Sequence, residues 1–182
     1  GSGVFLPDSP GFYVLDGETV LGLVQVESSA RLNKGRAVLK GLSGIPFITT
    51  KRIVEVPGKQ AKIRIHSAEP EFFIRTGDGR VPQLALVRAE ITGDKRHVTT
   101  VVIDVTGTAK YEQKEIPVLS SELARGVQRM VMSKKLEPGE YALLETTSEG
   151  LSSYVWEFGV EAVGGDSKTK TTKTAPAKSQ VK

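Results

Sequence analysis

The residues that could do chemistry in this chain stand at spacings that match no catalytic pattern. His66 and His97 are its two histidines, and neither belongs to a metal-ligand spacing such as HxH or HExxH. His66 falls on the polar side of an alternating segment, and His97 follows Lys95 and Arg96, so we expect both rings to face solvent. No serine lies in a GxSxG or SxxK pattern. The spacing therefore indicates neither a metal site nor an activated nucleophile.

The acidic and glycine-rich segments also favour a structural role over a catalytic or metal-binding one. Asp78 lies between two glycines and is followed by Arg80, whereas a calcium loop needs several oxygen ligands at fixed offsets. We expect a β-turn there. The chain has no cysteine, which excludes thiolate zinc sites, iron–sulfur clusters, disulfides and cysteine nucleophiles. We expect no catalytic residue, no cofactor and no metal, and hence no enzyme.

Two alternatives to that expectation stay open. The chain holds 21 acidic residues, so a pair of carboxylates suited to glycoside hydrolysis could meet in a cleft. An aromatic stripe of Tyr154, Trp156 and Phe158 could stack on sugars, but at strict strand spacing we interpret it as the buried face of a sheet. An exposed groove lined by two acids and aromatics would favour a glycan-active enzyme, and packed sheet faces would favour a noncatalytic module.

Turn residues separate short β-rich segments along most of the chain. Asp16-Gly17 predicts a hairpin between residues 12–15 and 18–26, because a type I′ turn needs positive φ at both central positions. Pro57-Gly58 predicts a type II turn. Residues 83–91, apolar on both faces, predict a central strand that pairs with residues 98–105.

One segment favours a helical turn instead. Residues 120–126 begin with two serines that could cap a short helix and end at Gly126.

These patterns predict an all-β fold of about nine to eleven strands, because strand signals alternate with turns and not with helices. We expect one antiparallel β-sandwich of immunoglobulin-like architecture over residues 4–163. Its predicted core comprises Ile63, Ile65, Leu86, Val101, Ile103, Leu143, Trp156 and Phe158.

Residues 164–182 differ sharply in composition. They hold five lysines and one acid, a net charge of +4, so the rest of the chain has 20 basic and 20 acidic residues and no net charge. With Val181 as its single large apolar residue, this segment is predicted to be a disordered Lys/Thr-rich tail. Its candidate contacts to a polyanion are Lys168, Lys170, Lys173, Lys178 and Lys182. No aromatic lies among them to stack on bases, so we expect no specific nucleic-acid binding.

Removal of the tail is a direct test of this division of charge. Truncation after Val163 is expected to change the free energy of unfolding by less than about 0.5 kcal/mol and to abolish any retention on heparin. Melting temperature and heparin retention of chains 1–182 and 1–163 measure both effects. A melting temperature several degrees lower in the short chain would show that the tail packs on the domain, and unchanged retention would place the basic patch elsewhere.

Two segments resemble those of uncharacterised exported bacterial β-sandwich proteins of the immunoglobulin-like and prealbumin-like kinds. Leu136-Glu137-Pro138-Gly139-Glu140-Tyr141-Ala142-Leu143 resembles a turn that opens a strand, and Trp156-Glu157-Phe158-Gly159-Val160 an aromatic strand that follows. The resemblance implies a periplasmic or secreted location and carries no catalytic residue.

The expected function is accordingly a noncatalytic binding or structural module of a bacterial envelope or secreted protein. Its partner would be another envelope protein or a glycan. No apolar run is long enough for a transmembrane helix.

Overall fold

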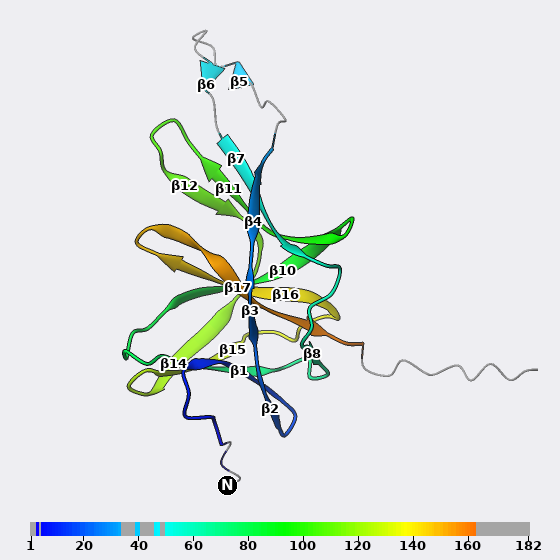
Figure 1. Ribbon diagram of the computed structural model, residues 1–182, viewed down its shortest axis with the longest axis vertical. Coiled ribbons are helices and arrows are strands. Elements are labelled where there is room, and N and C mark those ends of the chain that lie inside the picture. Colours follow the sequence, from blue (N-terminus) through cyan, green and yellow to red (C-terminus); the bar gives the residue numbers. More distant parts are fainter. Residues whose placement is uncertain (1–2, 4, 34–38, 41–45, 48–49, 163–182) are drawn as a thin grey trace, which may run out of the picture.

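The computed structural model describes residues 3, 5–33, 39–40, 46–47 and 50–162, and these residues form β-strands without any helix (Figure 1). The predicted all-β fold is confirmed, whereas the predicted tail at residues 164–182 lies outside the described residues. The strands are β1 Gly11–Asp16, β2 Thr19–Gly22, β3 Val24–Glu27, β4 Ser29–Leu32, β5 Leu39–Lys40, β6 Pro46–Phe47, β7 Thr50–Pro57, β8 Arg64–Ile65, β9 Glu71–Arg75, β10 Gln83–Thr92, β11 Lys95–Ile103, β12 Ala109–Glu112, β13 Lys114–Ile116, β14 Val118–Ala124, β15 Val127–Met132, β16 Gly139–Thr147 and β17 Gly150–Val160.

A five-stranded antiparallel sheet has the order β14-β15-β9-β1-β2 and lies at the lower end of the molecule in Figure 1. Its β1–β2 hairpin lies where Asp16-Gly17 predicted one, but the predicted type I′ turn is wrong. Asp16 pairs with Thr19, so the central residues are Gly17 and Glu18, and only Gly17 has a positive φ, of 63°; positive φ at the first central residue alone is typical of a type II′ turn. Residues with a side chain rarely adopt that backbone conformation, so glycine is favoured at this position. The turn sequence thus determined this hairpin locally.

The helical turn predicted at residues 120–126 is wrong. These residues form most of β14 and the turn to β15, with which β14 pairs from Val118↔Met132 to Ala124↔Val127. Gly126 has a φ of 76° and provides the turn between the two strands. A serine pair before a glycine suits a helix cap, but here pairing with a neighbouring strand satisfies the same backbone groups.

The larger sheet follows the path β3-β17-β16-β10-β11-β7-β4, and its two ends meet. Strands β3 and β4 are separated only by Ser28, whose backbone N–H donates to Ser153 O. The segment from Val24 to Leu32 therefore pairs with β17 through its first half and with β7 through its second half. The path therefore closes into a ring through this one continuous segment.

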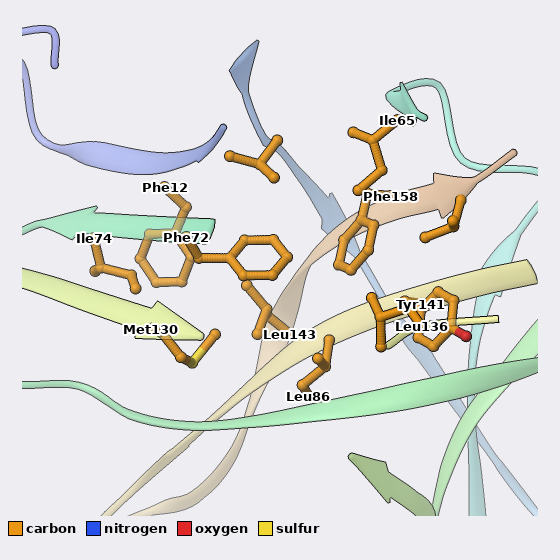
Figure 2. Packing of buried hydrophobic residues seen from close by; sticks show 12 residues of the cluster. Phe12, Ile65, Phe72, Ile74, Leu86, Met130, Leu136, Tyr141, Leu143 and Phe158 are labelled. Atoms are coloured by element: carbon orange, nitrogen blue, oxygen red, sulfur yellow. The ribbon is translucent and has the colours of Figure 1, made fainter. Parts of the chain in front are cut away.

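Two separate apolar clusters fill the molecule. The first lies between the five-stranded sheet and the outer face of β10, β16 and β17, as in a sandwich (Figure 2). The second lies inside the ring. Leu86 belongs to the first cluster and its neighbour Val87 to the second, so β10 is apolar on both faces, as predicted for a central strand. The buried members of the second cluster are Val54, Val56, Val87, Ala89, Val98, Ala142, Leu144 and Val155.

The predicted single core is therefore divided between two layers. Four of its residues are fully buried in the first cluster, namely Ile65, Leu86, Leu143 and Phe158. Ile63 and Trp156 are half-buried against that cluster, and Val101 is half-buried against the second. Ile103 is half-buried and belongs to neither, because β11 extends beyond the ring to pair with β12. Strand β8 departs from the antiparallel pattern, since it pairs in parallel with β17.

Asp16 joins the first hairpin to the segment that follows β8. Its carboxylate accepts hydrogen bonds from the backbone N–H groups of His66 and Ser67, at 3.0 and 2.8 Å, and lies 3.2 Å from His66 Nδ1. Burial of the carboxyl favours its neutral form, but the hydrogen bonds from Ser67 and His66 outweigh this and lower the pKa of Asp16.

Replacement of Asp16 by asparagine is expected to lower the free energy of unfolding by about 1 kcal/mol at pH 7. A carboxyl whose pKa is lowered on folding stabilises the fold above its unfolded pKa of about 3.9, and this contribution is lost as the pH falls through the lower folded value. The difference between wild type and variant should therefore shrink at pH 3. Urea unfolding at both pH values measures it, with Glu18→Gln, an exposed acid of the same hairpin, as control. An equal difference at both pH values would contradict the assignment.

Candidate functional site

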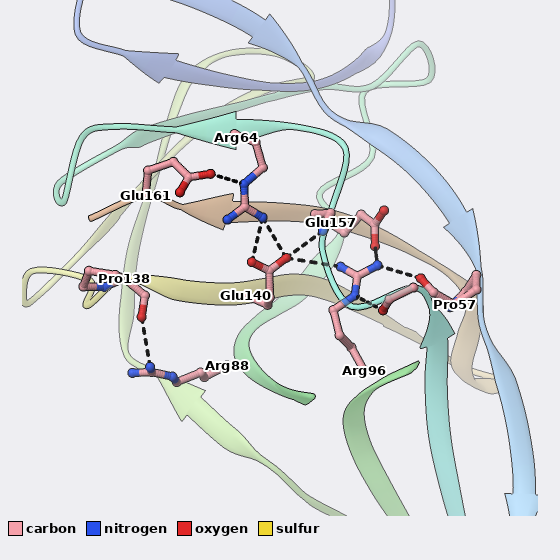
Figure 3. Close-up of polar contacts among 10 residues, drawn as sticks. Pro57, Arg64, Arg88, Arg96, Pro138, Glu140, Glu157 and Glu161 are labelled. Carbon is pink, nitrogen blue, oxygen red and sulfur yellow. Dashed lines mark hydrogen bonds and ion pairs between the residues drawn. The ribbon is translucent and has the colours of Figure 1, made fainter. Parts of the chain in front are cut away.

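A buried arginine organises the polar end of the ring. Arg96 of β11 is only 1% exposed. Its Nε donates to Gly58 O and its Nη2 to Pro57 O, both at 2.9 Å, so the predicted Pro57-Gly58 turn presents two carbonyls to it. Nη2 also lies 2.6 Å from Glu157 Oε2, and Nη1 lies 3.7 Å from Glu140 Oε1 (Figure 3). A guanidinium that is removed from water is stable only with such hydrogen-bond acceptors and opposite charges beside it.

Strand alternation explains why these charges meet. Arg96 lies directly opposite Val56, Glu140 lies two residues before Ala142, and Glu157 lies two after Val155, and each of those apolar residues belongs to the second cluster. Side chains two apart share a face of a strand, so the three charges form the next layer of the ring interior. The two segments that carry the family resemblance pair directly here, with Glu140 opposite Gly159 and Tyr141 opposite Phe158.

Arg64 of β8 extends the cluster toward the surface. Its Nη1 donates to both carboxylate oxygens of Glu140, at 2.9 and 2.6 Å, and its Nε donates to Glu161. The guanidinium lies directly over Gly159, where a Cβ would be 1.9 Å from Nη1. Glu140 also accepts a hydrogen bond from the backbone N–H of Ala61 at 2.6 Å. We call Arg64, Arg96, Glu140, Glu157 and Glu161 the ion cluster.

A cavity of about 470 Å³ opens beside the ion cluster. Arg64, Glu140 and Glu161 form its charged wall, together with Arg88 of β10. Arg88 donates to Glu137 at 2.7 Å and to Pro138 O at 3.0 Å. Both acids that line this cavity, Glu140 and Glu161, are therefore already paired with Arg64. The pKa of Glu161 is lowered, mainly by its hydrogen bond from Arg64.

A second cavity, of about 310 Å³, lies where β10 and β11 separate. These strands pair only from Glu90↔His97 to Thr92↔Lys95, after which β11 pairs with β12 and β10 with β13. The cavity is lined by Arg88, Glu90, His97, Val98, Thr100, Glu112, Gln113 and Lys114.

The acids of this second cavity are also paired. Lys114 forms an ion pair with Glu90 and lowers the pKa of that carboxyl. Glu112 lies 3.9 Å from Nζ of Lys51. His97 Nε2 lies 3.0 Å from Thr100 Oγ1, and His97 Nδ1 lies 4.0 Å from Glu90 Oε2. The lining therefore offers mixed charge and hydrogen-bonding groups without an aromatic platform.

The two histidines and Asp78, which were singled out from the sequence, have different surroundings in the structure. The His66 side chain is 78% exposed, as expected, whereas His97 is only 26% exposed, so the expectation that it faces solvent is wrong. Asp78 lies in the predicted turn, with its carboxylate accepting from Arg80 N–H at 3.0 Å.

Of two further sequence expectations, the structure describes the residues of only one. Tyr154 is 44% exposed while Phe158 is fully buried, so the aromatic stripe is a core face at one end only. The five lysines proposed to contact a polyanion, Lys168, Lys170, Lys173, Lys178 and Lys182, lie outside the described residues.

Sequence reasoning missed the ion cluster. A signal was present, because Glu157 stands between Trp156 and Phe158, and Glu140 precedes a fully apolar stretch. A charge on the face of a strand that otherwise points inward has to find a partner.

Within the part of the chain that the structure describes, no group of three or more His, Asp or Glu residues is arranged to hold a metal ion. The described residues also include no helix that is long and apolar enough to cross a membrane. Comparison of the chain with protein-family models, curated proteins and solved structures finds no match.

Proposed function

We propose that this chain is a noncatalytic binding or structural module of a bacterial envelope or secreted protein. The observation that carries the proposal is the pairing of the acids in both cavities. Glycoside hydrolysis needs a carboxyl group whose pKa is raised so that it can act as an acid. Here the pKa values of Glu90 and Glu161 are lowered by hydrogen bonds from the side chains of Lys114 and Arg64, respectively. Glu140 accepts hydrogen bonds from Arg64 and from the backbone N–H of Ala61.

The surroundings of these acids support the same proposal. Neither cavity lining contains a Phe, Tyr or Trp side chain on which a sugar ring could stack. The largest aromatic surfaces lie in the first apolar cluster, where Trp156 stacks on Phe12 with ring centroids 3.7 Å apart. The immunoglobulin-like arrangement belongs to the proposal as well, supported by the packing of the five-stranded antiparallel sheet on the outer face of β10, β16 and β17. The exported location is supported by the resemblance of the Leu136–Leu143 and Trp156–Val160 segments.

An assay for released reducing ends tests the noncatalytic part of the proposal. The full chain, incubated with β-glucan, chitin and peptidoglycan, is expected to release none above the blank. Release that disappears in Glu90→Gln or Glu140→Gln, but not in Glu137→Gln, would show a carboxylate-dependent hydrolase and overturn the proposal. Cell fractionation after expression of the complete gene tests the location, and retention in the cytoplasm would contradict it.

A further inference from the structure

We propose that the cavity of about 310 Å³ at the separation of β10 and β11 is a binding site for a small primary amine, whose ammonium group lies between Glu90 Oε2 and His97 Nδ1. This inference rests on the proposed function, because it names the chemical class of a ligand for the binding module.

The end of a strand pair places the two side chains beside each other. Glu90 and His97 are directly opposite in the last pair before β10 and β11 separate. Side chains of directly opposite residues lie on the same face of a sheet, and both of these line the cavity. The carboxylate and the imidazole ring therefore meet at the point where the strands part.

A β-bulge in β11 orients the His97 ring. The register with β7 shifts between His97 and Thr99. In a regular strand, residues 97 and 100 would point to opposite faces, but the extra residue of the bulge brings both to the same face. There His97 Nε2 lies 3.0 Å from Thr100 Oγ1. In the tautomer that donates from Nε2 to this hydroxyl, Nδ1 is an acceptor that faces Glu90.

The gap between the two acceptors has the span of one shared donor. Glu90 Oε2 and His97 Nδ1 lie 4.0 Å apart, which is too far for a hydrogen bond. Lys114 pairs with the other oxygen of the carboxylate, Oε1. Two acceptors that bond one ammonium nitrogen at about 2.8 Å each lie about 4–4.6 Å from each other. A single N–H donor group therefore fits between them.

The charges of the lining favour an ammonium group over a water molecule as this donor. Arg88 is paired with an acid outside the cavity. Among the other lining residues, the acids Glu90 and Glu112 face one cation, Lys114. The ion pair that Glu112 forms with Lys51 is long, with 3.9 Å between Oε1 and Nζ. A cation with N–H donors thus complements the cavity.

The charged group that faces His97 from the other neighbouring strand is already paired. Glu55 of β7 lies opposite His97. Its carboxylate is held by Arg31 at 2.9 Å and by Lys95 at 3.8 Å. Glu90 is therefore the acid that faces the ring with a free oxygen, and its pKa, lowered mainly by the hydrogen bond from Lys114, keeps it ionised at neutral pH.

NMR spectra of the histidine rings test the site in the full chain, because His66 and His97 are its two histidines. Butylamine at pH 8 is expected to shift the ring signals of His97 with a dissociation constant of about 1–20 mM, as befits so small a ligand. The signals of His66, whose side chain is 78% exposed, should not move. Butyltrimethylammonium at the same ionic strength has the charge but no N–H donor, so it should leave both rings unchanged.

A proton on Nδ1 would compete with the ammonium group, which gives a second readout. Ring nitrogen shifts of the butylamine complex should show the proton of His97 on Nε2. Because histidine ordinarily titrates near pH 6.5, the affinity for butylamine should fall about tenfold or more between pH 8 and pH 5.

The variant Glu90→Gln keeps an acceptor but removes the charge. The side chain is half-exposed, so the variant should fold, and its affinity for butylamine should fall about tenfold. Glu18→Gln, at an exposed acid of the β1–β2 hairpin, is the control and should bind like wild type.

Four results would each overturn the proposal. These are an unmoved His97 ring at about 100 mM butylamine, an equal response to butyltrimethylammonium, a proton on Nδ1 in the complex, and unchanged binding by Glu90→Gln. A water molecule in the gap would appear as the first of them. The reducing-end assay is independent of these readouts, so failure of the amine site and failure of the proposed function can be told apart.

Discussion

Replacement of Arg96 by methionine is expected to lower the free energy of unfolding by about 3–5 kcal/mol, the range for breaking a buried ion pair at one partner. Methionine fills much of the same volume but leaves Glu157 without the guanidinium that lies 2.6 Å away. The carbonyls of Pro57 and Gly58 lose their donors at the same time. Urea unfolding at pH 7 measures the loss.

Two further variants keep this prediction testable if Arg96→Met does not fold. Arg96→Lys retains the charge but not the planar fork that donates to two carbonyls and lies beside two carboxylates, so it should lose less than methionine. Arg88→Met removes an arginine that is 35% exposed and paired with Glu137, and it should cost less than about 1 kcal/mol. An Arg96→Met variant as stable as Arg88→Met would show that Arg96 does not hold the ring together.

Truncation of Phe158 to alanine is expected to cost about 3–5 kcal/mol. Phe158 is fully buried in the first cluster, where its ring centroid lies 5.1 Å from that of Phe72 and 5.5 Å from that of Tyr141. These contacts join the five-stranded sheet to β16 and β17, so the cavity left behind would lie between the two sheets.

The aromatic stripe of β17 provides matched controls on a single strand. Tyr154→Ala should change the free energy of unfolding by no more than about 0.5 kcal/mol, because the side chain is 44% exposed. Trp156→Ala should fall between the two, since its ring is half-buried but stacks on Phe12. Thermal and urea unfolding of the three variants measure the order. Equal losses for Tyr154 and Phe158 would contradict the described packing of the strand.

Local chemistry explains why the fold class and many boundaries could be predicted. The glycine at position 17 and the Pro-Gly pair at 57–58 restrict the backbone within a few residues, and both turns lie where expected, with positive φ at Gly17 and Gly58. Alternation on β17 and the doubly apolar pattern of β10 likewise depend on the strand period alone. The error at residues 120–126 has the opposite cause, because the choice between a capped helical turn and a strand there depends on pairing with β15.

The candidate site needed information that no single segment contains. The ion cluster draws Arg64 from β8, Arg96 from β11 and Glu140 from β16, and the contact between Arg64 and Glu140 joins residues 76 positions apart. Likewise, each half of the segment from Val24 to Leu32 pairs with a different strand, which closes the ring.

Backbone preferences and composition were enough to predict the all-β class, the turns at Gly17 and at Pro57-Gly58, and the excess of lysine beyond Val163. The tertiary structure alone decided the closed ring, the division of the core into two clusters, and the partners of the buried charges. The physical reason is that a strand satisfies its backbone and its inward side chains only through neighbours that are distant in the chain.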